Sequence, residues 1–133
     1  MFGFGRHRKL HLLVVDDSQV ARRVHRRILE DAGYTHISEA CNGIEALDLM
    51  EKLQIDILLT DWRMPHCDGL ELVTKLRAKR LRIPVIMISR VNTRDSILQA
   101  INAGVSSYIV KPFSTKTLLD KLSEQVEVWY GRS

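Results

Sequence analysis

The 133-residue sequence has no long hydrophobic run. Its longest apolar stretches, such as 10–15 and 83–88, are far shorter than the roughly 20 residues that cross a bilayer. Within residues 1–9 the positive charges follow the apolar residues, and no long apolar segment comes after them, which is the wrong order for a secretory signal. We therefore predict a cytoplasmic protein that does not insert into membranes.

Cysteine is scarce as well. Cys41 and Cys67 are the only two cysteines, they lie far apart, and they form no Cys-x-x-Cys pair. A disulfide framework or a structural zinc site is therefore not expected.

Acidic residues are fewer than basic ones, 16 against 20, which leaves a formal net charge of +4. The basic residues cluster at 6–9, 22–27 and 75–82, where solvated helix faces and a charged tail account for them. The arginine-rich face at 22–27 has no interleaved aromatic residues of the kind that nucleic-acid-binding surfaces use. Nucleic-acid binding is therefore a disfavoured alternative, which salt-sensitive binding to arbitrary DNA would revive.

The length and composition are those of one globular domain. A chain of 133 residues can bury a sizeable core, and 45% hydrophobic with 27% charged residues is typical of globular proteins. We predict one domain over 10–130 that folds as a monomer, a flexible basic tail over 1–9, and no output domain.

Strand-like and helix-like patterns alternate along the chain. The first apolar run ends in two aspartates, and Ser18 is a suitable cap for a helix that stops near Gly33. The predicted strands are 10–15, 36–40, 55–60, 85–88 and 107–110, and the apolar stripes of the helices that follow them lie at 21–29, 44–53, 70–76, 97–101 and 118–126. This alternation predicts an α/β fold, a parallel sheet with helices on both faces.

Polar side chains follow four of these predicted strands. They are Asp16, Asp17, Asp61, Ser89 and Lys111. Because ligands bind at the carboxyl ends of the strands in open parallel sheets, we expect these residues to meet at one edge.

The chemistry of this set favours an anion-accepting site. Three neighbouring carboxylates repel one another unless a cation such as Mg²⁺ neutralises them. Lys111 can bind a carboxylate or a phosphoryl oxygen, Ser89 offers a hydroxyl donor, and an aspartate in such surroundings can act as the nucleophile of a phosphoryl transfer. Any one of the aspartates alone could instead cap a helix or a turn.

Three motifs carry a resemblance that covers the chain from Leu12 to about Val128. Leu-Val-Val-Asp-Asp-Ser at 13–18, Asp-Trp-Arg-Met-Pro-His-Cys-Asp-Gly-Leu-Glu-Leu at 61–72 and Tyr-Ile-Val-Lys-Pro-Phe at 108–113 closely resemble the response regulator receiver family, and its chemotaxis members in particular. The resemblance implies a doubly wound (βα)5 fold of the flavodoxin-like class, with five parallel strands in the order 2-1-3-4-5.

The resemblance also implies roles for single residues. Asp61 would be the phosphoacceptor, Asp17 and the backbone carbonyl of Arg63 would bind Mg²⁺ directly together with Asp61, and Asp16 would act on the ion largely through water. Ser89 would follow the phosphoryl group and Lys111 would be its cationic partner.

A conformational switch is implied at the same edge. Tyr108 would turn inward when Ser89 moves, and the Lys111-Pro112 peptide bond would be cis. The resulting signal would be displayed on the surface formed by 94–98, Tyr108 and 116–121.

The implied function is that of a stand-alone response regulator in a two-component, chemotaxis-like phosphorelay. A sensor histidine kinase or a phosphotransfer protein would donate the phosphoryl group, and a protein target would read the surface. Such a protein is not an enzyme, because its only chemistry is its own phosphorylation and dephosphorylation.

Two arginines depart from the usual pattern. Arg90 follows Ser89, where the family commonly has a small residue, and Arg63 lies two residues after Asp61. We hypothesise that they bind phosphoryl oxygens and exclude attacking water, which would lengthen the lifetime of the acyl phosphate. The alternative is that either arginine pairs with Asp61 in the resting state and slows phosphorylation.

Two further alternatives remain open. A receiver-like docking module that works without phosphorylation is the stronger one, because the two arginines border the site. A dehalogenase-type enzyme would need a second aspartate two residues after the nucleophile, and Arg63 stands in that position.

Overall fold

The computed structural model describes residues 9–131, so the prediction of a flexible tail over 1–9 falls almost entirely outside the described residues. The strands are β1 (His11–Val15), β2 (His36–Ala40), β3 (Ile57–Thr60), β4 (Val85–Ser89) and β5 (Ser107–Val110). The helices are α2 (Gln19–Asp31), α3 (Gly43–Lys52), α4 (Gly69–Ala78), α5 (Arg94–Ala103) and α6 (Thr115–Tyr130).

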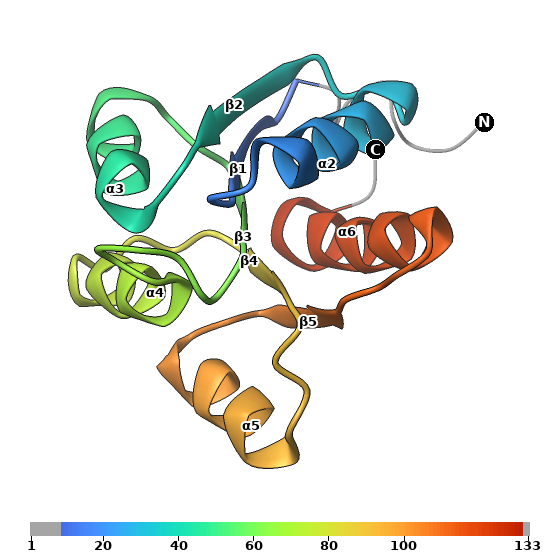
Figure 1. Cartoon of the computed structure of the whole chain (residues 1–133). Helices are drawn as coiled ribbons and strands as arrows, with labels where there is room; N and C mark the ends of the chain where they lie inside the picture. Colours follow the sequence, from blue (N-terminus) through green and yellow to red (C-terminus); the bar gives the residue numbers. More distant parts are fainter. Residues whose placement is uncertain (1–8, 132–133) are drawn as a thin grey trace.

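The strands form one parallel sheet in the order β2-β1-β3-β4-β5 (Figure 1), which confirms the predicted fold class and strand order. In Figure 1, α2 and α6 cover one face of the sheet, and α3, α4 and α5 cover the other. Within residues 9–131, no helix combines the length and the apolar character that crossing a bilayer requires.

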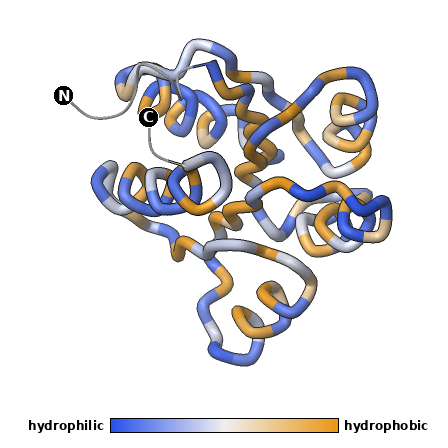
Figure 2. The backbone as a smooth tube through the Cα atoms, turned by 180° about the vertical axis from the view of Figure 1, so that it is seen from behind, coloured by the Kyte–Doolittle hydropathy of each residue, from blue (hydrophilic) through white to orange (hydrophobic). Residues whose placement is uncertain are grey.

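Side chains of the strands fill a separate hydrophobic cluster on each face of the sheet. Successive residues of a strand point to opposite faces, so Leu58 belongs to the cluster on the α3, α4 and α5 side, whereas Leu59 belongs to the cluster on the α2 and α6 side. Figure 2 shows the hydrophobic positions along the central strands and the mixed character of the surrounding helices. The sheet is therefore buried on both faces, as a parallel sheet requires.

Polar caps begin the helices. Ser18 at the start of α2 accepts a hydrogen bond from the backbone N–H of Ala21, as the sequence predicts for this cap, and Asp68 at the start of α4 forms a reciprocal capping box with Glu71. Gly104 ends α5 in the left-handed conformation, with φ of 116°.

The element boundaries differ from the predictions by one or two residues. The first strand begins at His11 rather than at 10, and the third begins at Ile57 rather than at 55. The ladder between β1 and β3 starts at the Leu12 and Ile57 pair, and Asp56 just before it is tied to His11 by backbone and side-chain hydrogen bonds. Apolar character alone does not mark where this ladder begins.

Candidate functional site

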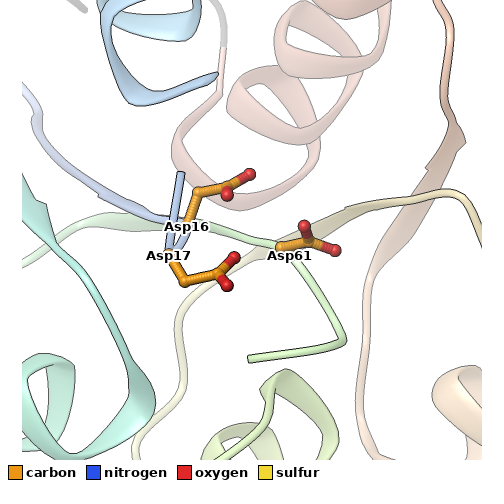
Figure 3. Close-up of side chains that lie close together, drawn as sticks. All are labelled: Asp16, Asp17 and Asp61. Atoms are coloured by element: carbon orange, nitrogen blue, oxygen red, sulfur yellow. The ribbon is translucent and has the colours of Figure 1, made fainter. Parts of the chain in front are cut away.

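Three aspartates gather at the carboxyl ends of β1 and β3 (Figure 3). Asp16 and Asp17 follow β1, and Asp61 follows β3, which is paired with β1 through Val15 and Thr60. One carboxylate oxygen from each aspartate lies within 4.8 Å of the others. The parallel pairing of two strands that are far apart in sequence thus produces the predicted acidic cluster.

Asp16 is the buried member of this cluster, with 1% of its surface exposed. The backbone N–H of Ser18 donates to its Oδ1 at 2.9 Å, and Lys111 Nζ donates to its Oδ2 at 3.0 Å. Arg22 donates to its backbone carbonyl at 2.6 Å. Asp17, by contrast, is exposed, so the cluster opens to solvent on that side.

Asp61 is held through both carboxylate oxygens. The backbone N–H of Trp62 donates to Oδ1 at 2.6 Å, and Lys111 Nζ donates to Oδ2 at 3.1 Å. Burial raises the pKa of Asp61 above its ordinary value and the negative charge of Asp16 adds to this rise, while Lys111 opposes it. The side chain is nevertheless 15% exposed, so a reactant can reach it.

Lys111 bridges Asp16 and Asp61 from the end of β5. Burial acts to lower the pKa of Lys111, but the hydrogen bond to Asp16 and the negative charges of both aspartates outweigh it, so the pKa is raised. Its backbone N–H donates to the carbonyl of Ser89 at 2.8 Å, and the Lys111-Pro112 peptide bond is cis. The ammonium group is therefore charged and aimed at the two carboxylates.

Ser89, at the end of β4, is buried. It lines a pocket of about 430 Å³ together with Asp61, Arg63, Arg90 and Val91. Both arginine side chains are at exposed positions, and in the part of the chain that the structure describes neither forms an ion pair with Asp61. The alternative of a resting-state pair between an arginine and Asp61 finds no support here.

Tyr108 on β5 is half-buried and reaches the loop that follows Ser89. Its hydroxyl donates to the backbone carbonyl of Val91 at 2.5 Å, and its ring meets that of Trp62 edge-on at 6.5 Å. Burial raises the pKa of Tyr108. The tyrosine is thus in contact with both the Ser89 loop and the residue next to Asp61.

Several residues that build this site were not singled out from the sequence. The backbone N–H of Trp62 donates a hydrogen bond to the Asp61 carboxylate, and the Arg22 guanidinium donates one to the backbone carbonyl of Asp16. Gly69 is required because a Cβ there would lie 2.0 Å from the backbone carbonyl oxygen of Asp61. Trp62 and Gly69 lie within the second motif, but their contacts depend on how the loop folds back.

The arrangement fits a hard divalent cation. Carboxylate oxygens are the ligands that Mg²⁺ prefers, and three of them converge on one place with a solvent-facing side for the remaining ligands. A single lysine only partly compensates the three negative charges, which leaves the cluster suited to a cation. Asp16, Asp17 and Asp61 are the side chains that could hold it.

Comparison with known proteins links this geometry to a family. A family model described as the response regulator receiver domain matches residues 12–123. The chain is 42% identical over 118 residues to a chemotaxis protein CheY homolog of Campylobacter jejuni, covering 86% of this chain and 91% of that protein. It is 38% identical over 122 residues to the chemotaxis protein CheY-3 of Vibrio cholerae, covering 90% and 94% respectively.

Solved structures agree with the sequence comparison. The chemotaxis protein CheY4 of Vibrio cholerae superimposes with a TM-score of 0.81 at 30% sequence identity, covering 87% of this chain and 98% of that one. The likeness therefore extends over nearly the full length of both chains.

Proposed function

This chain belongs to the response regulator receiver family of two-component signalling, and we propose that it works by accepting a phosphoryl group on Asp61. The observation that supports this most directly is the position of Asp61, which contacts Lys111, lies beside two further aspartates, and lines a pocket with Ser89. No other aspartate of the cluster is both reachable and held in this way.

Mg²⁺ is the cofactor we propose. Asp17 and Asp61 would hold it with the backbone carbonyl of Arg63, and Asp16 would act largely through water. When bound, the ion supplies positive charge that offsets the repulsion between the aspartates and the incoming phosphoryl group.

The transfer itself needs little more than positioning. An Asp61 carboxylate oxygen forms a bond to phosphorus while the bond from phosphorus to the imidazole nitrogen of a phosphohistidine breaks, and the imidazole leaves with that electron pair. Lys111 compensates charge on the phosphoryl oxygens, and the Ser89 hydroxyl is placed to donate to one of them. Hydrolysis of the resulting acyl phosphate is the only other reaction we propose, so the protein is a signalling protein and not an enzyme.

Phosphorylation replaces the single negative charge of the Asp61 carboxylate with a phosphoryl group of about −1.5 to −2 charges and adds acceptor oxygens, which would draw Ser89 and Lys111 toward the new group. The Tyr108 hydroxyl donates to the backbone carbonyl of Val91, and the backbone N–H of Val91 donates to Ser89 Oγ, so a movement of Ser89 would shift the partner of Tyr108. The output surface we propose is formed by α5, β5 and α6, where Leu98, Ile101 and Val110 are exposed apolar residues. A protein target would bind there.

The setting we propose is a chemotaxis-like phosphorelay in the cytoplasm. The donor is a sensor histidine kinase or a phosphotransfer protein, and the receiver acts as a monomeric response regulator. The relatives named CheY support this setting.

The test is the intact mass of the protein after incubation with acetyl phosphate and Mg²⁺. We expect the parent to gain one phosphoryl group and Asp61→Asn to gain none. Asp17→Asn, at an exposed position, should gain much less because the cation would be held poorly, while Asp48→Asn, an exposed aspartate on α3, should behave like the parent. If the parent gains no phosphoryl group, the docking module becomes the better account.

A further inference from the structure

A second hollow lies at the edge of the sheet opposite the aspartate cluster. It has a volume of about 850 Å³ and is lined by the segments that lead into β4 and β5 and by the last turns of α6. Those segments precede strands, so the hollow is at the amino-terminal ends of β4 and β5. Its volume is within the range of about 300–1,000 Å³ that is usual for small-molecule sites.

The hollow is positively charged. Arg77, Arg80 and Arg82 line it, and none of its lining residues is acidic. Over residues 9–131, no carboxylate forms an ion pair with any of the three, although the neighbouring Lys79 is paired with Glu51. Three guanidinium groups without a carboxylate partner are therefore collected around one cavity.

Arg77 forms the fixed wall of the hollow. Its guanidinium donates to the backbone carbonyl oxygens of Gly104 and Leu81, both at 2.8 Å, and lies 6.0 Å from the centre of the Trp129 ring. Burial lowers the pKa of Arg77, and so does the positive charge of Arg82. Arg80 and Arg82 are exposed and make no such contacts with other residues of the described range 9–131, so their guanidinium groups are available to a ligand.

The α6 residues of the hollow contribute an aromatic ring and an apolar side chain. Trp129 is half-buried, and its indole N–H donates to Gln125 Oε1 at 3.2 Å, which fixes the ring. Val128 beside it is 76% exposed. An oriented aromatic ring in the same hollow as the free guanidinium groups of Arg80 and Arg82 suits a ligand that carries both a flat ring and an anionic group. Flat rings stack on indole, and guanidinium groups form bidentate hydrogen bonds with phosphate.

We propose that this hollow binds a nucleotide, with the phosphate at Arg80 and Arg82 and the base against Trp129. The site is separate from Asp61 and does not depend on the proposed function. A nucleotide fits better than a simple anion because the phosphate-binding arginines and the aromatic ring belong to the same cavity.

The test is titration of the full chain with adenosine and guanosine mono- and triphosphates and, separately, with inorganic phosphate, without Mg²⁺ and with a chelator present. Binding is followed by calorimetry and by amide chemical shifts. We expect saturable binding of at least one nucleotide, with the largest shifts at 104–106 and 125–129. Arg80→Ala combined with Arg82→Ala should weaken binding about tenfold or more, and Trp129→Leu at least about fivefold.

Matched variants separate this site from the aspartate cluster. Arg23→Ala removes an exposed arginine on α2 and should bind like the parent, and so should Asp61→Asn. The double arginine variant should still gain a phosphoryl group from acetyl phosphate to the same extent as the parent.

Four results would overturn the proposal. They are no saturable binding of any of these nucleotides, binding that survives the double arginine change, binding that is lost in Asp61→Asn, and binding of inorganic phosphate as tight as that of the nucleotides.

Discussion

At the scale of single residues, the unusual feature of the proposed phosphoacceptor site is its pair of arginines. Arg63 and Arg90 share a pocket with Asp61, and the carboxylate is ion-paired with Lys111 instead of with either of them. Both guanidinium groups are therefore available when a phosphoryl group brings new negative charge to Asp61. This favours the hypothesis that they act on the phosphorylated state.

We predict that Arg90→Ala and Arg63→Asn each shorten the lifetime of the acyl phosphate by about twofold to tenfold. The reason is that each change removes a donor for phosphoryl oxygens and opens a path for water. The measurement is the decay of the phosphorylated intact mass after acetyl phosphate is removed.

Arg23→Ala, an exposed arginine on α2, is the matched control and should decay like the parent. Unchanged decay in both site variants would rule out a role for these arginines in setting the lifetime.

At the scale of elements, α2 packs against the loop between β5 and α6 through a buried histidine. His25 is 4% exposed, and its ring lies 5.6 Å from that of Phe113 in the loop after β5. Burial lowers the pKa of His25 below its ordinary value of 6.5, the charge of Lys111 lowers it further, and Asp16 opposes these effects. The folded chain therefore keeps this imidazole neutral to a lower pH than the unfolded chain does.

We predict that His25 makes the fold less stable as the pH falls below about 6.5. Below that pH the His25 imidazole binds a proton in the unfolded chain but stays neutral in the folded chain. The free energy of unfolding therefore decreases by at most about 1.4 kcal/mol per pH unit for this one group. His25→Leu should remove this part of the pH dependence, which urea unfolding at about pH 7.5 and about pH 5.5 would measure.

His36→Gln changes an exposed histidine on β2 and should retain the pH dependence of the parent. The explanation fails if His25→Leu and the parent lose equal stability between the two pH values.

At the scale of the whole molecule, one sheet is shared by two hydrophobic clusters. β1, β3 and β4 each contribute side chains to both clusters, and neighbouring residues Leu58 and Leu59 are at most 1% exposed on opposite faces. Loss of packing on one face therefore loosens strands on which the other face depends.

We predict that Leu58→Ala and Leu59→Ala each reduce the free energy of unfolding by about 2–5 kcal/mol, and that both variants still unfold in a single transition. Urea unfolding followed by tryptophan fluorescence, to which Trp62 on one face contributes, and by circular dichroism would show coincident curves. Separate curves for the two probes would mean that the faces unfold independently.

Most of the fold could be predicted from local patterns. The alternation of strands and helices, the Ser18 cap and the helix stop near Gly33 depend on residues close together in the chain, where periodicity and backbone preference act. The start of β3 could not be predicted in this way. Ile55 is as apolar and buried as a strand residue, but the pairing with β1 begins only at Ile57. The strand order came from the resemblance to the family, not from the residues themselves.

The sequence by itself also determined which polar residues meet, because side chains at the carboxyl ends of parallel strands share one edge. Only the tertiary structure decided how they are connected. Lys111 reaches Asp16 across 95 residues of sequence, Asp61 is ion-paired with Lys111 and not with Arg63 or Arg90, and Arg77 lies over Trp129 beside a second hollow. These contacts depend on which loops lie side by side after folding, and a local sequence pattern cannot predict which loops those are.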